Sequence, residues 1–145
     1  MTTPASGNIV ALDVGDKRVG VAIASVAARL ASPLATLNRG AEFMAGLEKL
    51  LAANAASAVV VGLPRNLSGQ DTAQTRQTRK FIADLSAQIN LPVYAQDEAV
   101  TSIAAETELR ARGKPYVKAD IDALAATYIL EDYLQASLNK EINHA

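Results

Sequence analysis

The stretch Asn8-Ile9-Val10-Ala11-Leu12-Asp13-Val14-Gly15 decides the fold, because an apolar run leads to a single carboxylate and a glycine follows. Val and Ile favour β-strands, and a near-continuous apolar run is typical of a strand that is buried on both faces. The apolar run 19–24 comes next, after the charged segment Asp16-Lys17-Arg18. The chain is therefore predicted to open with two strands that are joined by a charged turn.

Asp13 stands near the end of the first predicted strand. A buried carboxylate is costly unless it is paired, hydrogen-bonded or bound to a cation. Two interpretations follow. Either Asp13 caps the turn, or it holds a metal ion, and the spacing of this segment alone leaves both open.

The composition limits the chemistry that the chain can perform. The 145 residues suit one domain, and 50% of them are hydrophobic, which is enough for a core. Cysteine is absent and the single histidine, His144, is the penultimate residue, so thiolate chemistry and a positioned imidazole are not expected. The net charge of −1 means that nucleic-acid binding would depend on a local basic patch.

The chain is expected to form a single domain over residues 9–139, between flexible tails at 1–8 and 140–145. The first eight residues lack the basic and apolar regions of a signal peptide. No apolar run is long enough to span a membrane, so a cytoplasmic protein without membrane contact is expected.

Alternating strand and helix patterns predict an α/β fold. Further strands are expected at 30–37, 58–61 and 92–96, and helices at 41–54, from 71 or 72 to 89, 101–112 and 120–139. Three strands come first, and strands then alternate with helices. This order predicts a five-stranded mixed sheet, made of an antiparallel three-strand meander plus two parallel strands and flanked by helices.

Acidic residues follow or end several of these elements. Functional sites of open α/β sheets gather at the carboxyl ends of parallel strands, where Asp13 and the Asp97-Glu98 pair are expected. Strand alternation puts Asp97 and Glu98 on opposite faces, so only one of them should point at Asp13. Carboxylates that converge there would suit a hard cation such as Mg²⁺.

The last predicted helix offers Asp120 and Asp122 as a further ligand. Asp122 shares a face with Ala125, Ala126 and Ile129 at helical spacing, so it is the better candidate for a place against the sheet. The alternative for both acids is a favourable interaction with the amino end of the helix dipole.

Basic and polar residues in the loops are candidates for contact with nucleic acid. They are Lys17, Arg18, Arg65, Asn66, Thr101 and Ser102. Each cation alone could equally be a solvated surface charge. An acidic pocket with a basic rim is nevertheless what cleavage of a phosphodiester requires. Thr101 and Ser102 stand at a predicted helix start, where backbone amides also favour phosphate.

Four segments together resemble the YqgF (RuvX) family, which is RNase H-like. They are residues 11–22, 61–69, 97–102 and 122–130, in the order that this family has them. The resemblance implies an RNase H-like five-stranded sheet and a nuclease that uses one or two Mg²⁺ or Mn²⁺ ions. It also implies that Asp13, Glu98 and Asp122 are the catalytic, metal-binding acids.

The same resemblance implies a substrate and partners. The family is assigned to trimming the 5′ end of precursor 16S ribosomal RNA, and was earlier proposed to resolve Holliday junctions in branched DNA. Ribosomal particles or assembly factors are the implied partners, and the protein would be a monomer or a homodimer. Ala99, Arg65, Ser68 and Asp16 depart from the residues that are usual in the family.

Two other functions fit parts of the sequence. A non-catalytic module that binds RNA or a ribosome-assembly partner would keep the acids without turnover. An acid-glycine hairpin also resembles the phosphate-binding hairpin of actin-like ATPases, but those enzymes need two such domains. The sequence favours metal-assisted hydrolysis of a phosphodiester, with protons passed through water, a phosphate oxygen or Lys17.

Overall fold

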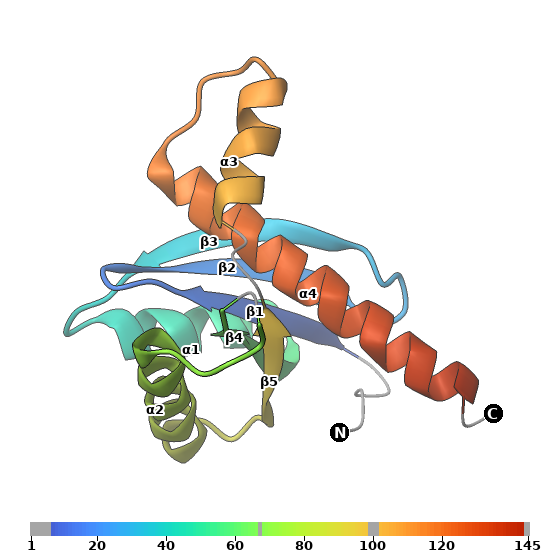
Figure 1. Cartoon of the computed structure of the whole chain (residues 1–145). Helices are drawn as coiled ribbons and strands as arrows, with labels where there is room; N and C mark the ends of the chain where they lie inside the picture. Colours follow the sequence, from blue (N-terminus) through green and yellow to red (C-terminus); the bar gives the residue numbers. More distant parts are fainter. Residues whose placement is uncertain (1–6, 67, 99–101, 144–145) are drawn as a thin grey trace.

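A five-stranded mixed sheet forms the centre of the molecule (Figure 1), in the strand order β3-β2-β1-β4-β5. The computed structural model describes residues 7–66, 68–98 and 102–143. The strands are β1 (Asn8–Val14), β2 (Arg18–Ser25), β3 (Ala31–Asn38), β4 (Ala56–Pro64) and β5 (Val93–Glu98). β1, β2 and β3 are antiparallel neighbours, whereas β4 is parallel to β1 and β5 to β4. The predicted fold class is confirmed.

The position of each strand follows from its sequence. β1 and β4 lie inside the sheet, and their apolar runs are fully buried. β3 lies at an edge and contains Pro33, where the register with β2 shifts, as expected for a residue that cannot donate to a ladder. β5 ends at Glu98, so Asp97 and Glu98 lie within the strand, whereas the sequence predicted that they follow it.

Four helices are present in the described residues. They are α1 (Phe43–Ala53), α2 (Ala73–Gln88), α3 (Ser102–Ala111) and α4 (Lys118–Asn143). Thr72 caps α2 through a reciprocal capping box with Thr75, which decides between the two predicted starts. α4 begins two residues before its predicted start at 120 and ends four residues after its predicted end at 139. None of these helices is long and apolar enough to cross a membrane.

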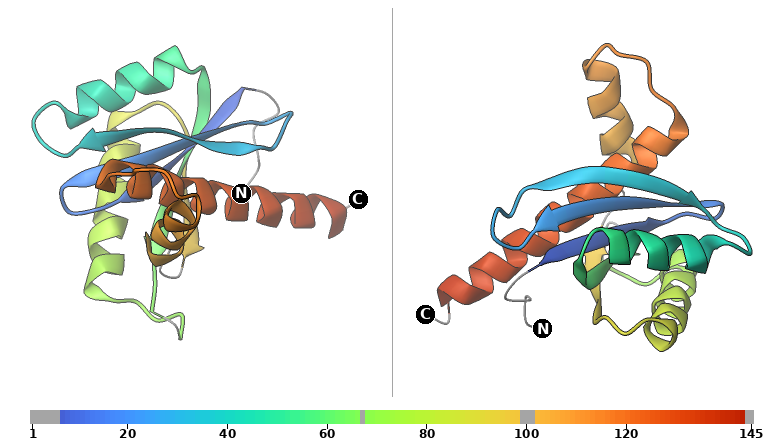
Figure 2. Two further views of the ribbon diagram at one scale, coloured as in Figure 1. Left: turned by 90° about the horizontal axis from the view of Figure 1, so that it is seen from above. Right: turned by 180° about the vertical axis from the view of Figure 1, so that it is seen from behind.

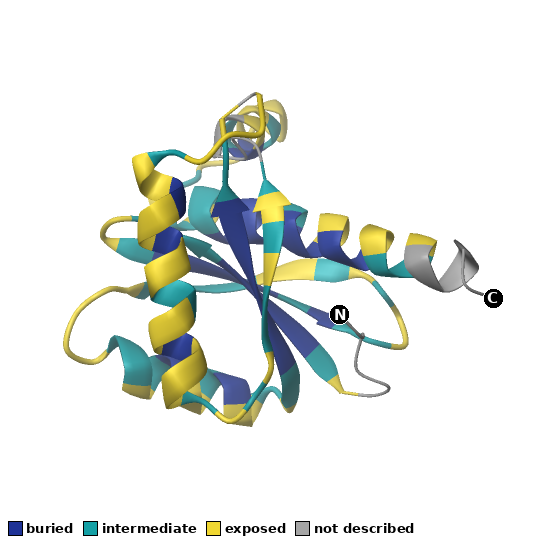
Figure 3. Ribbon diagram, turned by 60° about the horizontal axis from the view of Figure 1, so that its bottom comes forward, coloured by how far each residue is buried: buried dark blue, intermediate teal, exposed yellow. Residues whose placement is uncertain are grey.

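The helices cover the sheet unequally. α1 and α2 pack on one face, and α4 crosses the other (Figures 1 and 2). The residues of α2 that face the sheet are buried and its outer residues are exposed (Figure 3). α3 stands away from the sheet beside the amino-terminal part of α4.

Two glycines allow α4 to lie close to the sheet. A β-carbon at Gly62 of β4 would lie 2.4 Å from Cδ1 of Ile129, and one at Gly20 of β2 would overlap the backbone of Asp122. The start of α4 is also tied to β3, because the Thr36 hydroxyl donates to the carbonyl of Ala119 at 2.7 Å. These contacts place the first turns of α4 beside the carboxyl end of β1.

Candidate active site

Asp13 lies near the carboxyl end of β1 on the face that α4 covers. Ile9 and Ala11 share this face through strand alternation, and both are buried in the core beneath α4. Burial first and the nearby charge of Asp122 second together raise the pKa of the Asp13 carboxyl from 3.8 to about 6. Both causes disfavour the ionised form, so Asp13 would gain from a cation beside it.

Glu98 lies on the same face at the end of β5. Tyr94 precedes it by four residues in the strand and packs against the core beneath α4, whereas Asp97 points to the opposite face. The structure therefore places Glu98, and not Asp97, on the face of Asp13. Oε1 of Glu98 is buried and has no hydrogen-bond partner in the described part of the chain.

The pKa of the Glu98 carboxyl is raised to about 9. Burial is the largest cause, and a hydrogen bond to Asp132 and the charges of Asp132, Asp13 and Asp97 add to it. Asp13 loses its proton at lower pH than Glu98, so Asp13 is already charged when Glu98 ionises. Near neutral pH the geometry thus favours an ionised Asp13 beside a protonated Glu98.

Asp122 lies in the second turn of α4, above β2. Arg18 Nε donates to Asp122 Oδ2 at 2.6 Å, and the two side chains are 33% and 22% exposed. Asp122 therefore faces the sheet, close enough to Asp13 to raise its pKa. Asp120 instead accepts a hydrogen bond from the backbone amide of Val117 at 2.9 Å, which is a helix-capping role.

The three acids gather at one edge of the sheet but do not form a closed ligand set. Within residues 7–66, 68–98 and 102–143, no three His, Cys, Asp or Glu side chains lie close enough together to hold one metal ion. The raised pKa values of Asp13 and Glu98 nevertheless show that a negative charge on either carboxyl is poorly stabilised by its surroundings. Carboxylate oxygens are also the donors that Mg²⁺ and Mn²⁺ prefer. The donor set fits a divalent cation.

Arg65 is committed to neighbouring carboxylates. Its Nε donates to Asp97 Oδ1 at 2.9 Å and its Nη1 to Asp71 Oδ1 at 2.5 Å. Asp71 also pairs with Arg79. These ion pairs join the start of the β4–α2 loop to β5. The guanidinium of Arg65, which was predicted to contact phosphate, is therefore already paired with carboxylates.

Asn66 shapes the same loop. Its Oδ1 accepts hydrogen bonds from the amides of Ser68 and Gln70, at 3.1 and 2.8 Å, and from the Ser68 hydroxyl at 2.9 Å. Such side-chain contacts replace missing backbone partners in a turn. The hydrogen bonds of the Asn66 side chain thus stabilise the conformation of its own loop.

For Lys17, Thr101 and Ser102, which were also predicted to contact nucleic acid, the structure gives fewer details. Lys17 is exposed in the turn between β1 and β2, close to the acids in sequence. Thr101 lies outside the described residues, and Ser102 is described only as the first residue of α3. Arg18 is therefore the predicted cation that the structure places in contact with one of the acids, Asp122.

Sequence reasoning missed Asp132 as a neighbour of Glu98. Asp132 precedes Tyr133, a residue of the sheet-facing stripe of α4, so it lies at the edge of that stripe. Helical spacing from Asp122 selected Ala125, Ala126 and Ile129 and gave no reason to consider Asp132. The contact arises because α4 is long enough to cross from β2 to β5, which the sequence alone did not establish.

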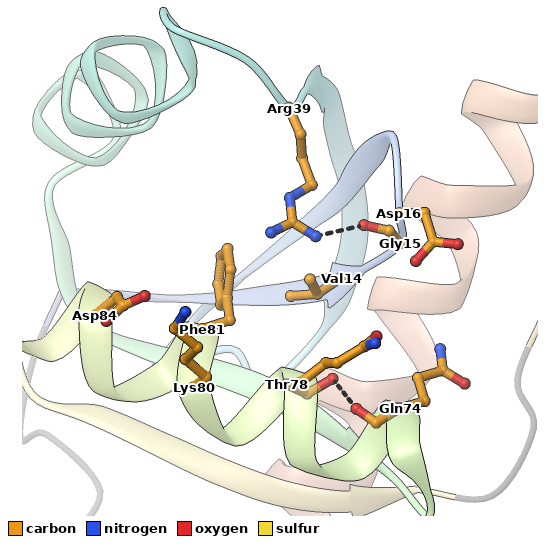
Figure 4. A pocket seen from close by; sticks show the side chains of 10 residues that line it. Val14, Gly15, Asp16, Arg39, Gln74, Thr78, Lys80, Phe81 and Asp84 are labelled. Carbon is orange, nitrogen blue, oxygen red and sulfur yellow. Dashed lines mark hydrogen bonds between the residues drawn. The ribbon is translucent and has the colours of Figure 1, made fainter.

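A separate cavity of about 300 Å³ lies on the opposite face, between the end of β1 and α2 (Figure 4). Arg39 donates to the carbonyl of Gly15 at 3.0 Å there, and its guanidinium lies 5.4 Å from the centre of the Phe81 ring. Lys80 and Asp84 also line it. Asp13, Glu98 and Asp122 do not line this cavity, so it is distinct from the acidic site.

Solved structures share this fold. RuvC of T. thermophilus in complex with a Holliday junction substrate is 16% identical, with a TM-score of 0.52 over 91% of this chain and 96% of that one. The fowlpox virus Holliday junction resolvase is 14% identical, with a TM-score of 0.52 over 89% and 99% of the two chains. These likenesses concern the fold alone, and they show that this chain shares the fold of both resolvases.

Sequence comparison then identifies the family. The pattern of the family RuvX, described as Holliday junction resolvase, matches residues 7–136. A Chloroflexus aggregans protein is 43% identical over 135 residues, which cover 90% of this chain and 95% of that protein. A Pseudomonas putida protein is 36% identical over 134 residues, which cover 89% and 95%. Both carry the name "Putative pre-16S rRNA nuclease".

The chain belongs to the RuvX family, and the predicted resemblance is confirmed. Membership makes it an enzyme of the hydrolase class that acts on ester bonds, a nuclease. The finer predictions, which concern the metal, the substrate and the role of each acid, belong to the proposal that follows.

Proposed function

We propose that this protein is a metal-dependent nuclease that hydrolyses phosphodiester bonds during 5′-end maturation of precursor 16S ribosomal RNA. The observation that carries the proposal is the meeting of Asp13 and Glu98 on one face, with Asp122 beside Asp13. Bringing partly buried carboxylates together costs a fold stability unless a cation lies among them. Such a group is therefore a candidate for function.

Asp13, Glu98 and Asp122 would hold one or two Mg²⁺ or Mn²⁺ ions, which supply water activation and neutralise charge on the phosphate. The protein side chains have distinct tasks around them. Glu98, with its raised pKa, holds a proton at neutral pH until a cation replaces it. Arg18 contacts Asp122 and Lys17 is exposed in the adjoining β1–β2 turn, so both would suit the phosphates that flank the cleaved bond.

We propose precursor ribosomal RNA as the substrate because the relatives carry names that refer to it. The net charge of −1 limits unassisted binding to long nucleic acid. We therefore include a ribosomal particle or an assembly factor as a partner, in the cytoplasm, with the enzyme as a monomer or a homodimer.

The substrate is tested by offering the purified protein two nucleic acids with Mn²⁺. One is an RNA that carries the precursor 5′ extension of 16S ribosomal RNA, and the other is a four-way DNA junction. The proposal expects cleavage of the RNA at the extension and slower or no resolution of the junction. Loss of RNA cleavage in EDTA and its return with added Mn²⁺ would support the metal requirement.

Branched DNA is the second candidate, because the matched family is described as Holliday junction resolvase and both structural neighbours are resolvases. Symmetric cleavage of the junction, with the RNA left intact, would replace the proposal with that activity. Binding of either nucleic acid without any metal-dependent turnover would favour the non-catalytic module.

A further inference from the structure

Arg18 and Asp122 form an ion pair between the first turn of the chain and the last helix, 104 residues apart. The contact runs from Nε to Oδ2 at 2.6 Å, and both side chains are partly shielded from water. A charge-assisted hydrogen bond of this length is strong among protein contacts. Asp122 is thus paired with the guanidinium of Arg18. The carboxyl of Asp13 has a pKa that is raised by burial and by the charge of Asp122.

The backbone fixes both partners of this pair. Arg18 begins β2, and its carbonyl accepts the amide of Gly15 at 2.9 Å. The backbone of Asp122 lies against Gly20, so α4 cannot move toward the sheet to change the contact. Of the two side chains, that of Arg18 is the longer and the more exposed, so it is the one better able to rearrange.

The same pair stands next to Asp13. Gly20 is the residue of β2 that pairs with Asp13, and Arg18 precedes Gly20 by two positions on the same face. A cation held by Asp13 and Asp122 together would therefore lie in the space that the guanidinium now shares. In the described residues Asp122 is paired with Arg18, and no three acidic side chains lie close enough together to hold one metal ion.

We propose that Arg18 is the resident counter-ion of Asp122 and that a divalent cation competes with it for this carboxylate. Metal binding then releases the guanidinium toward a phosphate of the substrate. This inference rests on the proposed function, since it assigns Asp122 to the metal. Arg18 is a positioning residue in this account, and it makes the binding of metal and of phosphate mutually favourable.

The direct test observes the Arg18 Nε–H group by nuclear magnetic resonance in the full-length protein. The signal is assigned by its absence from Arg18→Lys. Titration with Mg²⁺ should shift this signal in step with metal binding measured by calorimetry. An Arg18 signal that stays unchanged while Mg²⁺ binds would overturn the competition.

Metal affinity provides the second readout. Arg18→Gln should bind Mn²⁺ about tenfold more tightly than the parent protein, because no guanidinium has to be displaced. Arg18→Lys keeps a cation and should stay near the parent affinity. Lys17→Gln removes one charge from the same turn without touching Asp122, so its smaller effect measures the general electrostatic change.

The outcomes separate the two proposals. Cleavage of RNA with Mn²⁺, together with equal Mn²⁺ affinity in Arg18→Gln and Lys17→Gln, would remove the competition and leave the nuclease in place. Absence of any metal binding in the parent protein and in Arg18→Gln would remove both. Should Arg18→Gln fail to fold, the Nε–H titration of the parent protein still decides.

Discussion

A β-carbon at Gly20 would lie 1.9 Å from the carbonyl oxygen of Asp122 and 2.9 Å from the amide nitrogen of Ala123. Real non-bonded atoms do not approach so closely. Glycine at position 20 is therefore what allows α4 to bring Asp122 down to the sheet. This relationship links a motif residue of the second strand to an acid that lies 102 positions later.

We expect Gly20→Ala to push α4 away from β2. The free energy of unfolding should fall by about 3 kcal/mol, as for an overpacked core, and nuclease activity should fall with it. Urea denaturation and the RNA cleavage assay measure the two effects. Gly46→Ala in α1 is the matched control, because nothing lies within 4 Å of its added β-carbon and alanine favours the helix. Equal stability of Gly20→Ala and the parent protein would contradict the close approach.

The metal-free protein should become less stable as the pH rises. The folded-state pKa of Asp13 is about 6 against an ordinary value of 3.8, so its stabilising share is complete below 3.8 and is lost as the pH passes about 6. Asp13→Asn should remove the part of this dependence that Asp13 contributes, while the part from the raised pKa of Glu98 remains. It should stabilise the protein above about pH 7 by at most about 3 kcal/mol. Urea denaturation in EDTA across this pH range measures the effect.

Glu48→Gln, on an exposed part of α1, provides the control for the loss of one carboxylate. It should leave the slope of stability against pH unchanged between about pH 4 and pH 7. A parallel slope in Asp13→Asn and the parent protein would show that Asp13 does not carry the strain that we assign to it.

Arg65 and Lys17 should differ in their contribution to RNA binding. Arg65 is paired with Asp97 and Asp71, whereas Lys17 is exposed in the β1–β2 turn. We expect Lys17→Gln to reduce the slope of log affinity against log salt by about 0.7, the value for one phosphate contact with a single strand. Arg65→Gln should leave this slope unchanged. Fluorescence anisotropy with a labelled RNA over a salt series measures both, and a reduced slope for Arg65→Gln would return Arg65 to the phosphate contacts.

Bound metal should stabilise the folded protein. Mn²⁺ at about 100 times its dissociation constant should raise the free energy of unfolding by about 2.7 kcal/mol in the parent protein. Asp13→Asn should show little of this gain because it lacks the central ligand. Thermal unfolding with and without Mn²⁺ compares the two proteins, and the same upward shift in both would contradict the ligand assignment.

The architecture followed from short-range patterns. The apolar runs of β1 and β4 and the helical spacing on α1 and α2 are local features, and they predicted the mixed sheet. Strand alternation likewise anticipated that Asp97 and Glu98 face opposite ways. The ends of elements were less predictable, because residues such as Gly62 and Asp97 join a strand through pairing with a distant neighbour.

The pairing of charged side chains was not accessible from the sequence. In the sequence, Arg18 and Arg65 are both simply basic residues in predicted loops. In the structure Arg18 pairs with Asp122, whereas Arg65 pairs with Asp97 and Asp71. Arg18 meets Asp122 across 104 residues and Arg65 meets Asp97 across 32, whereas Asp71 reaches Arg65 within one loop through the turn at Asn66. The proximity of Asp132 to Glu98 has the same origin.

Metal-dependent cleavage by Asp13→Asn is the most direct test of the central claim. The substrate is the precursor 16S RNA end, Mn²⁺ is held constant, and Asp16→Asn removes the same charge from an exposed position in the neighbouring turn. Our account predicts that Asp16→Asn cleaves at close to the parent rate and that Asp13→Asn loses at least about a hundredfold, since removing one transition-state contact is worth that much. Cleavage by Asp13→Asn at the rate of Asp16→Asn would contradict the assignment of this acidic site.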